Sequence, residues 1–282
     1  MANQHFAKIA DVWKHLPLVE VLTIERPTVY AESHAGSAQY PLTRSAERDY
    51  GVFWFLDHAD ESSATAGSSY RAVLSKLTTH GRYPSIYPGS AELAMMVLGT
   101  GATYILCDTD SGSAASLREG AMHAGLLERT RIVQDDGRTV VWNEAESSPE
   151  LHDWAVHIDP FDAFGLGMRG GPSAVDLARR LGQKGALVAY WYGYSEPDRA
   201  RWAWGEIASP IRRDVSSVWC GHVTFAEPES DSAILGCGVL LINAGQKSLD
   251  RCEELGRGLE RIYQDAALPS GHRGSISFEA LR

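Results

Sequence analysis

Aspartates follow three successive apolar runs of the chain. Asp108 follows ATYILC, Asp135 and Asp136 follow TRIVQ, and Asp159 follows WAVHI. In an open α/β sheet a ligand lies outside the carboxyl ends of the strands. A carboxylate there can accept hydrogen bonds from both hydroxyls of a ribose, which suits Asp108, or from an adenine amine. The three strand ends together predict a nucleoside site, although each alone is also typical of a helix cap or a solvated turn.

Asp159 is followed directly by Pro160. A turn of this kind directs a carboxylate and a main-chain carbonyl to one point. That arrangement can accept both hydrogens of an amine and leave its lone pair aimed at an electrophile. The other interpretation is a strand stopped by proline with an ordinary Asp turn.

A small turn follows the first predicted strand, with the sequence Ser33-His34-Ala35-Gly36-Ser37-Ala38. Gly36 allows backbone N–H groups to approach a ligand closely. Such turns are common after strands, so a tight βα turn without a ligand is the alternative. Two tyrosines just beyond the fifth predicted strand, Tyr192 and Tyr194, are candidates to line a pocket at the same edge.

The elements that position these residues alternate along the chain. Short β-branched runs predict seven strands, and apolar periodicity predicts helices between them. The strands are expected at 28–33, 102–107, 130–134, 154–158, 185–192, 216–225 and 237–243, and helices at 12–24, 89–99, 112–127, 171–184 and 195–208. This order indicates a doubly wound α/β sheet whose last two strands form a hairpin. Residues 44–86 fit no strand and are interpreted as a small helical insertion within a domain made of 1–43 and 87–282.

Composition is that of a globular protein, with 44% hydrophobic and 22% charged residues in a chain of 282. No apolar run approaches the ~20 residues of a membrane helix, and no signal-peptide pattern is present. Four cysteines without CxxC spacing predict reduced core thiols, a cytoplasmic location and no metal site. The net charge of −10 makes a large basic surface for nucleic acid less expected.

Several segments together resemble one family. Residues 10–15 (ADVWKH) are similar to its HADVLKH segment, 33–40 (SHAGSAQY) to its THAGAGRY turn, and 87–90 (YPGS) to its YPGS segment. Asp136-Gly137 is similar to its DG, Asp159-Pro160 to the start of its DPPY, and Trp191-Tyr192 to its WYP segment. The chain thus resembles the large-subunit ribosomal RNA methyltransferase J family, which methylates the exocyclic amine of an adenine in 23S rRNA with S-adenosylmethionine.

This resemblance implies a class I, Rossmann-like methyltransferase fold with a seven-stranded, mostly parallel sheet. It implies that Asp108 holds the ribose of S-adenosylmethionine, that Asp136 meets the adenine, and that Lys14 is catalytic together with Asp159. The full set of expected cofactor-binding residues is His15, His34, Gly36, Ser90, Asp108, Asp136 and Asp159.

The chain departs from the family at the acceptor side. The DPPY motif is here Asp159-Pro160-Phe161-Asp162, so the tyrosine that stacks on the target adenine is absent. Such stacking contributes roughly 1–3 kcal/mol. Lys8 and Ile9 replace a His and an Asn of the family, and Ala38 replaces a glycine. The expected acceptor pocket consists of Pro160, Phe161, Asp162 and Tyr192.

The sequence therefore predicts an S-adenosylmethionine-dependent methyltransferase that acts on a small-molecule acceptor, at nitrogen. Asp159 would orient the acceptor and help to take up its proton. Two carboxylates, Asp159 and Asp162, favour a cationic or amine-bearing acceptor. Three alternatives stay open: the family's rRNA substrate, a cofactor-binding protein without catalysis, and an enzyme that uses another part of the cofactor. No membrane partner is expected, and the sequence predicts no oligomeric state.

Overall fold

Eight strands form the central sheet of the protein, in the order β12-β8-β9-β7-β6-β1-β4-β5. The computed structural model describes residues 6–165, 171–196, 199–215, 217–227 and 234–282. The strands are β1 Val29–Glu32, β4 Thr103–Cys107, β5 Thr130–Val133, β6 Trp154–Ile158, β7 Leu187–Tyr194, β8 Val218–Thr224, β9 Gly236–Ile242 and β12 Ser277–Leu281. Strands β5, β4, β1, β6 and β7 are parallel, whereas β9 is antiparallel to both β7 and β8.

The seven predicted strands all lie in this sheet, and β8 and β9 form the predicted hairpin. The number of strands is nevertheless eight, because β12 pairs antiparallel with β8 at the edge. Strand β12 was not predicted, because this edge strand is only half-buried, with Ser277 and Glu279 exposed. Phe278 anchors the strand through an edge-on contact with the Trp13 ring, at 5.3 Å between centroids.

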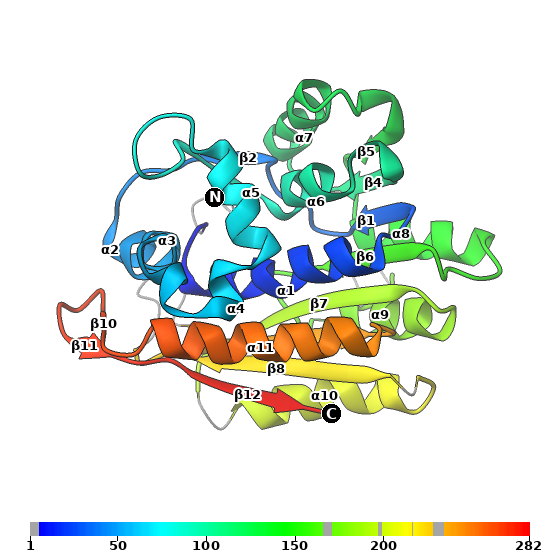
Figure 1. Ribbon diagram of the computed structural model, residues 1–282. Coiled ribbons are helices and arrows are strands. Elements are labelled where there is room, and N and C mark those ends of the chain that lie inside the picture. Colours follow the sequence, from blue (N-terminus) through cyan, green and yellow to red (C-terminus); the bar gives the residue numbers. More distant parts are fainter. Residues whose placement is uncertain (1–5, 166–170, 197–198, 216, 228–233) are drawn as a thin grey trace.

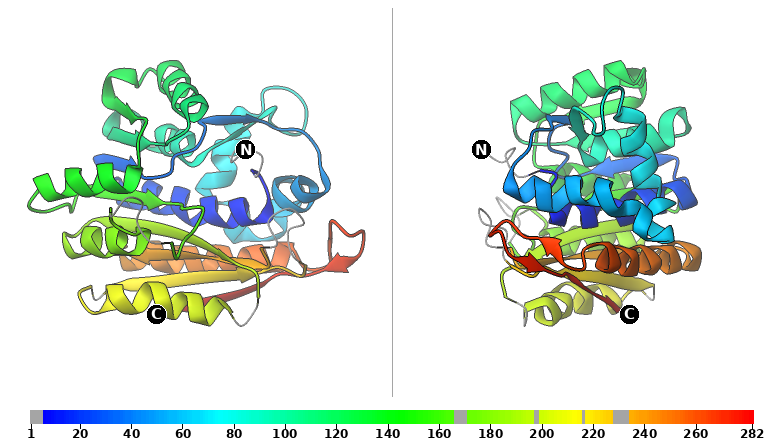
Figure 2. Two further views of the ribbon diagram at one scale, coloured as in Figure 1. Left: turned by 180° about the vertical axis from the view of Figure 1, so that it is seen from behind. Right: turned by 60° about the vertical axis from the view of Figure 1, so that its left-hand side comes forward.

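Helices cover both faces of the sheet (Figures 1 and 2). One face carries α1 Ile9–Glu25, α6 Ser90–Leu98, α7 Ser111–His123 and α11 Gln246–Ile262, and the other carries α8 Gly137–Ser147, α9 Ala174–Gln183 and α10 Arg199–Arg212. Each layer buries its own apolar cluster against the sheet, which is the doubly wound arrangement. Residues 197–198 of one predicted helix and residue 216 of one predicted strand lie outside the described residues.

Short helices occupy the chain between β1 and α6. They are α2 Ala46–Arg48, α3 Trp54–His58, α4 Ser63–Ala66 and α5 Ser69–Leu77. The two ends of this segment are joined by an antiparallel strand pair, β2 Gln39–Pro41 with β3 Ile86–Pro88. Helix α5 packs on α1, and α3 and α4 pack on α11, so the segment lies over the same face of the sheet as α1 (Figure 1). A further small pair, β10 Ala266–Ala267 with β11 Arg273–Gly274, precedes β12.

The described part of the chain contains no helix that is both long enough and apolar enough to span a bilayer. Its four cysteines are buried free thiols. Burial raises the pKa of Cys107 and of Cys220 to about 12, so these thiols stay protonated at neutral pH and behave as core residues.

Candidate functional site

The carboxyl ends of β1, β4 and β6 meet at one edge of the sheet. Glu32 at the end of β1 lies level with Leu106 of β4 and with His157 of β6. Asp108 and Asp159 each follow two residues beyond these partners. The parallel register therefore brings both predicted carboxylates to the edge beside the turn that follows β1.

The side chain of Asp108 is hydrogen-bonded to the turn after β1. Its Oδ2 accepts the Gly36 N–H at 2.8 Å, and its Oδ1 accepts the Asp110 N–H at 2.8 Å. Gly36 adopts a left-handed backbone with φ of 60°, and a Cβ there would lie 2.9 Å from the Tyr40 hydroxyl. A glycine is thus required by both conformation and space. Each oxygen of Asp108 keeps a second lone pair that a ligand hydroxyl can use.

The start of α6 packs against the same turn. A Cβ on Gly89 would lie 2.3 Å from the Ser37 carbonyl oxygen, so only glycine permits this approach. The Ser37 N–H donates to the Tyr40 hydroxyl at 3.0 Å. Tyr40 in turn stacks on Phe6, with 4.8 Å between ring centroids. Tyr40 ends the segment 33–40 that resembles the family's turn, whereas no sequence pattern indicated its contact with Phe6.

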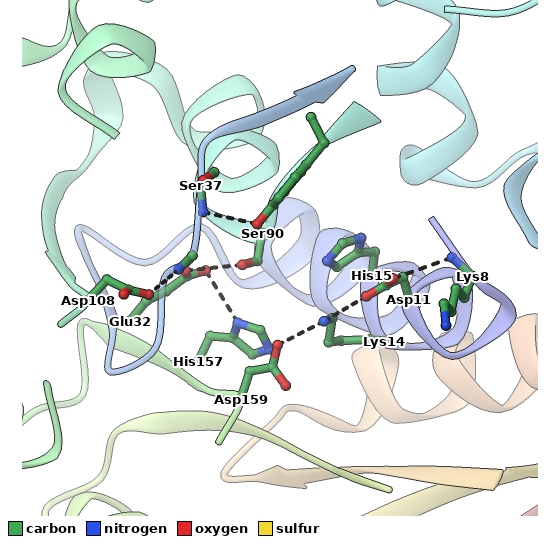
Figure 3. Close-up of polar contacts among 12 residues, drawn as sticks. Lys8, Asp11, Lys14, His15, Glu32, Ser37, Ser90, Asp108, His157 and Asp159 are labelled. Atoms are coloured by element: carbon green, nitrogen blue, oxygen red, sulfur yellow. Dashed lines mark hydrogen bonds and ion pairs between the residues drawn. The ribbon is translucent and has the colours of Figure 1, made fainter. Parts of the chain in front are cut away.

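Lys14 lies between two carboxylates. Its Nζ is 2.8 Å from Asp11 Oδ1 and 2.8 Å from Asp159 Oδ2, and all three side chains are mostly buried (Figure 3). Burial alone lowers the pKa of Lys14, but the two carboxylates outweigh burial and raise it. Burial raises the pKa of Asp159, but the Lys14 ammonium outweighs it and holds that pKa below its usual value. The site therefore keeps Lys14 charged and Asp159 ionised.

Glu32 is fully buried, and its carboxylate contacts two hydroxyl donors and one histidine nitrogen. The Tyr30 hydroxyl donates to its Oε1, the Ser90 hydroxyl donates to its Oε2 at 3.1 Å, and His157 Nδ1 lies 3.3 Å from Oε1. Ser90 is thus beside the site, as predicted from the sequence, but its hydroxyl contacts Glu32. His157 was not predicted, because nothing in the run WAVHI separates a site histidine from a strand residue.

His15 follows Lys14 on α1 and is buried. Its Nδ1 is 2.8 Å from the Tyr87 hydroxyl, which is 2.9 Å from the Tyr70 hydroxyl of α5. Burial, aided by the positive charge of Lys14, lowers the pKa of His15 well below its usual value, so the ring is neutral. His15, which was predicted to bind the cofactor, is therefore connected by hydrogen bonds to the helical segment between β1 and α6.

Asp136 caps α8 and is paired with Arg138. Its Oδ1 accepts from the backbone N–H and from Nε of Arg138, each at 3.1 Å, and its Oδ2 accepts from Arg138 Nη2 at 3.0 Å. Burial raises the pKa of Asp136, but Arg138 outweighs burial and lowers it. His34 lies near both, since the charges of Asp136 and Arg138 act on its ring, although burial chiefly lowers its pKa. Arg138 is buried and was not predicted.

The acceptor-side residues separate in the structure. Phe161 is fully exposed, and Asp162 accepts the Phe164 N–H at 3.1 Å in a local turn after the buried Pro160. Tyr192 is buried on the face that α9 and α10 cover, where its hydroxyl contacts His222 and lies 3.3 Å from Cys220 Sγ. Tyr192 therefore lies on the opposite face of the sheet from Lys14, and not in the predicted acceptor pocket.

Trp191, not Tyr192, faces the Lys14 side of β7. Because side chains alternate along a strand, neighbouring residues of β7 face opposite layers. Lys14 Nζ lies 5.5 Å from the centre of the Trp191 ring, within the range of a cation–π contact. Of the described residues, no three His, Cys, Asp or Glu side chains form a group that could hold a metal ion.

Comparison with solved structures supports the fold. The crystal structure of protein LPL1258 of the DUF519 family from Legionella pneumophila superimposes with a TM-score of 0.76 over 98% of each chain, at 18% identity. An O-methyltransferase from Bacillus cereus in complex with SAH has a TM-score of 0.44 and 10% identity, over 86% of this chain and 85% of that one. No family model matches the chain, and no curated protein matches its sequence.

The protein thus belongs to the doubly wound α/β class and shares its whole fold with LPL1258. Within that class it carries a buried carboxylate and lysine site at the carboxyl ends of β1, β4 and β6.

Proposed function

We propose that this protein is an S-adenosylmethionine-dependent methyltransferase that acts on a nitrogen of a small-molecule acceptor. The observation that carries the proposal is the ion pair between Lys14 and Asp159, placed at the carboxyl edge of the sheet beside the glycine turn held by Asp108. The resemblance of the sequence segments to the rRNA methyltransferase J family supports the same cofactor.

The residues present suit the cofactor. Asp108 offers a free lone pair on each oxygen, which matches the two hydroxyls of a ribose. Asp136 caps α8 at the neighbouring strand end and keeps acceptor capacity on Oδ2 for an adenine amine. Gly36 lies in the turn after β1 with His34, Ser90 contacts Glu32 at the end of that strand, and His15 follows Lys14 on α1. When bound, S-adenosylmethionine supplies an electrophilic methyl group on its sulfonium.

Asp159 orients the acceptor in this mechanism. The Lys14 ammonium donates a hydrogen bond to Oδ2 of Asp159. No described residue donates to the other oxygen, Oδ1. Oδ1 can therefore accept a hydrogen bond from an N–H of the acceptor amine. Holding the amine in line with the methyl group supplies most of the catalysis, since alignment converts a bimolecular step into a unimolecular one. Asp162 adds negative charge nearby, and the net charge of −10 favours an amine over an anionic acceptor.

A second candidate is the family's reaction on an adenine of 23S rRNA. Phe161, Phe164 and Trp202 are exposed large hydrophobic side chains, and Phe164 and Trp202 are in ring contact at 5.2 Å. Phe161 comes two residues after Asp159, so these rings offer a place for a planar base to stack. The altered DPPY motif and the net charge favour the small-molecule acceptor over this candidate.

The decisive experiment is calorimetric titration with S-adenosylmethionine and S-adenosylhomocysteine. Micromolar binding to the wild-type protein that Asp108→Ala abolishes would support the cofactor site. Asp214→Ala, which removes a surface ion pair with Arg179, is the matched control and should bind normally. No binding to the wild-type protein would overturn the proposal.

Methyl transfer from labelled S-adenosylmethionine then separates the remaining alternatives. Label in a small amine that Asp159→Asn abolishes supports the first candidate, and label in a 23S rRNA transcript supports the second. Binding without transfer to either would identify a cofactor-binding protein. Release of a cofactor fragment without methyl transfer would identify an enzyme that uses another part of the cofactor.

A further inference from the structure

The turn after β1 has its backbone donors occupied by the protein itself. Each N–H group from residue 35 to residue 38 is hydrogen-bonded internally: Ala35 to the Cys107 carbonyl at 2.8 Å, Gly36 to Asp108 Oδ2 at 2.8 Å, Ser37 to the Tyr40 hydroxyl at 3.0 Å and Ala38 to Ser116 Oγ at 3.1 Å (Figure 3). Turns of this kind commonly bind an anion through such groups. A ligand with an anionic group therefore needs another donor here.

Tyr40 offers that donor. Its hydroxyl oxygen accepts the Ser37 N–H, and no described residue accepts the hydroxyl hydrogen. Burial raises the pKa of Tyr40, so the hydroxyl keeps its proton at neutral pH. Because a tyrosine hydroxyl accepts and donates at once, it replaces the Ser37 N–H by an O–H donor that lies further from the backbone.

Packing fixes the position of the Tyr40 hydroxyl. The ring stacks on Phe6 with 4.8 Å between centroids and 18° between planes. A Cβ on Gly89 would lie 3.4 Å from Tyr40 Cε2, and a Cβ on Gly36 would lie 2.9 Å from the hydroxyl oxygen. The donor is thus oriented before a ligand arrives, which reduces the entropy lost on binding.

The hydroxyl occupies a definite place along the edge of the sheet, where the strands follow one another as β5, β4, β1 and β6. Asp136 follows β5 and Asp108 follows β4. The Tyr40 hydroxyl lies on the turn after β1, and Asp159 follows β6. The charges of Lys14 and Asp159 act on Tyr40, so its ring is near the predicted acceptor side. A cofactor with its adenine at Asp136 and its ribose at Asp108 would therefore extend its methionyl chain past the Tyr40 hydroxyl.

The methionyl chain ends in an ammonium and a carboxylate. An ammonium only donates hydrogen bonds and a carboxylate only accepts them, so the hydroxyl hydrogen suits the carboxylate. We propose that Tyr40 binds the methionyl carboxylate of S-adenosylmethionine through its hydroxyl hydrogen, while the Ser37 N–H holds the hydroxyl oxygen. This contact makes the site specific for the intact amino-acid end of the cofactor. The inference rests on the proposed function, because it needs S-adenosylmethionine at this edge.

The test is calorimetric titration of the full-length protein with S-adenosylmethionine and with its decarboxylated form, which keeps the adenosine, the sulfonium and the ammonium. The wild-type protein should bind the decarboxylated form at least about tenfold more weakly, as the loss of a hydrogen bond to a charged group implies. Tyr40→Phe keeps the ring on Phe6 and should weaken binding of S-adenosylmethionine about tenfold, with little change for the decarboxylated form. Tyr83→Phe is the matched control, because it removes the hydroxyl of another half-buried tyrosine, which donates to Asp57 of α3. It should bind both ligands as the wild-type protein does.

The pair of ligands separates recognition from a purely structural role of Tyr40. If the hydroxyl only holds the turn, Tyr40→Phe weakens both ligands equally, because both need the neighbouring contact of Asp108 with Gly36. That result, or unchanged binding of S-adenosylmethionine by Tyr40→Phe, would overturn the inference. Equal affinity of the wild-type protein for the two ligands would also overturn it, and that measurement needs no variant. If the wild-type protein binds neither ligand, the proposed function itself fails and this inference fails with it.

Discussion

The ammonium of Lys14 lies 2.8 Å from Oδ2 of Asp159, although 145 residues separate the two in the chain. One belongs to the first helix and the other follows the sixth strand, so the pair fastens α1 to the carboxyl edge of the sheet (Figure 3). Asp11, one turn earlier on α1, contacts the same ammonium. The site is thus a single cation shared by two carboxylates.

Replacing Lys14 by methionine should destabilise the protein. The substitution keeps most of the side-chain volume but leaves two largely buried carboxylates without their cation, which costs about 3 kcal/mol when a buried pair is broken. Chemical denaturation at pH 7 measures the loss of unfolding free energy, which should diminish as the pH falls and the carboxylates become protonated.

The matched control is Arg179→Met, which breaks the ion pair with Asp214 at the surface. Both side chains of that pair are more than one third exposed, so its loss should cost less than about 1 kcal/mol. If Lys14→Met and Arg179→Met lose the same unfolding free energy, the Lys14 ion pair stabilises the protein no more than a surface ion pair does.

Strand and helix alternation is predictable from the sequence because buried parallel strands are short, apolar and regularly spaced. Edge strand β12 is not, since its half-buried pattern resembles an ordinary surface segment. The convergence of Asp108 and Asp159 is also predictable, because parallel strands end at one edge.

Partners that depend on side-chain direction are not predictable in this way. Asp136 is paired with Arg138, and Tyr192 faces His222, because the geometry of a helix start and the alternation of β7 decide those contacts. The contact of His157 with Glu32 joins residues 125 apart in the chain, and no local pattern in either segment indicates it.

Gly89→Ala should damage the site and the fold together. The new Cβ would lie 2.3 Å from the Ser37 carbonyl oxygen, so the turn after β1 must move away from α6. We expect a loss of about 2 kcal/mol in stability, typical of overpacking, and at least tenfold weaker binding of S-adenosylhomocysteine. Thermal unfolding and calorimetry measure the two effects.

Gly205→Ala is the control for this prediction, because a Cβ there meets nothing within 4 Å. Gly205 lies inside helix α10, where alanine is favoured over glycine by about 1 kcal/mol. This variant should be slightly more stable than the wild-type protein and should bind the cofactor product equally well. If Gly89→Ala also keeps its stability and its binding of S-adenosylhomocysteine, Gly89 does not pack closely against the turn after β1.

Phe161→Ala separates the two acceptor candidates. The side chain is fully exposed, so its removal should change stability by less than about 0.5 kcal/mol. If a base stacks on this ring, binding of a single-stranded RNA oligonucleotide should weaken about tenfold, as a loss of ~1.4 kcal/mol implies. Fluorescence anisotropy measures this, with Met122→Ala, an exposed apolar residue of α7, as the control. Unchanged and salt-sensitive RNA binding would favour the small-molecule acceptor.

Acid should destabilise the protein as the pH falls below 6.5, because burial lowers the pKa of several histidines. Burial, together with the charge of Arg201, brings the pKa of His222 to about 4, and burial lowers the pKa of His15 as well. Below pH 6.5 the unfolded chain binds protons at these histidines while the folded chain does not, so stability is complete above 6.5 and is lost as the pH falls. His222 alone accounts for about 3 kcal/mol between pH 6.5 and 4, at ~1.4 kcal/mol per pH unit. Denaturation curves at several pH values measure this slope, which should be shallower in His222→Gln and unchanged in His152→Gln. A wild-type stability that is constant from pH 6.5 to 4.5 would contradict the buried, neutral state of these rings.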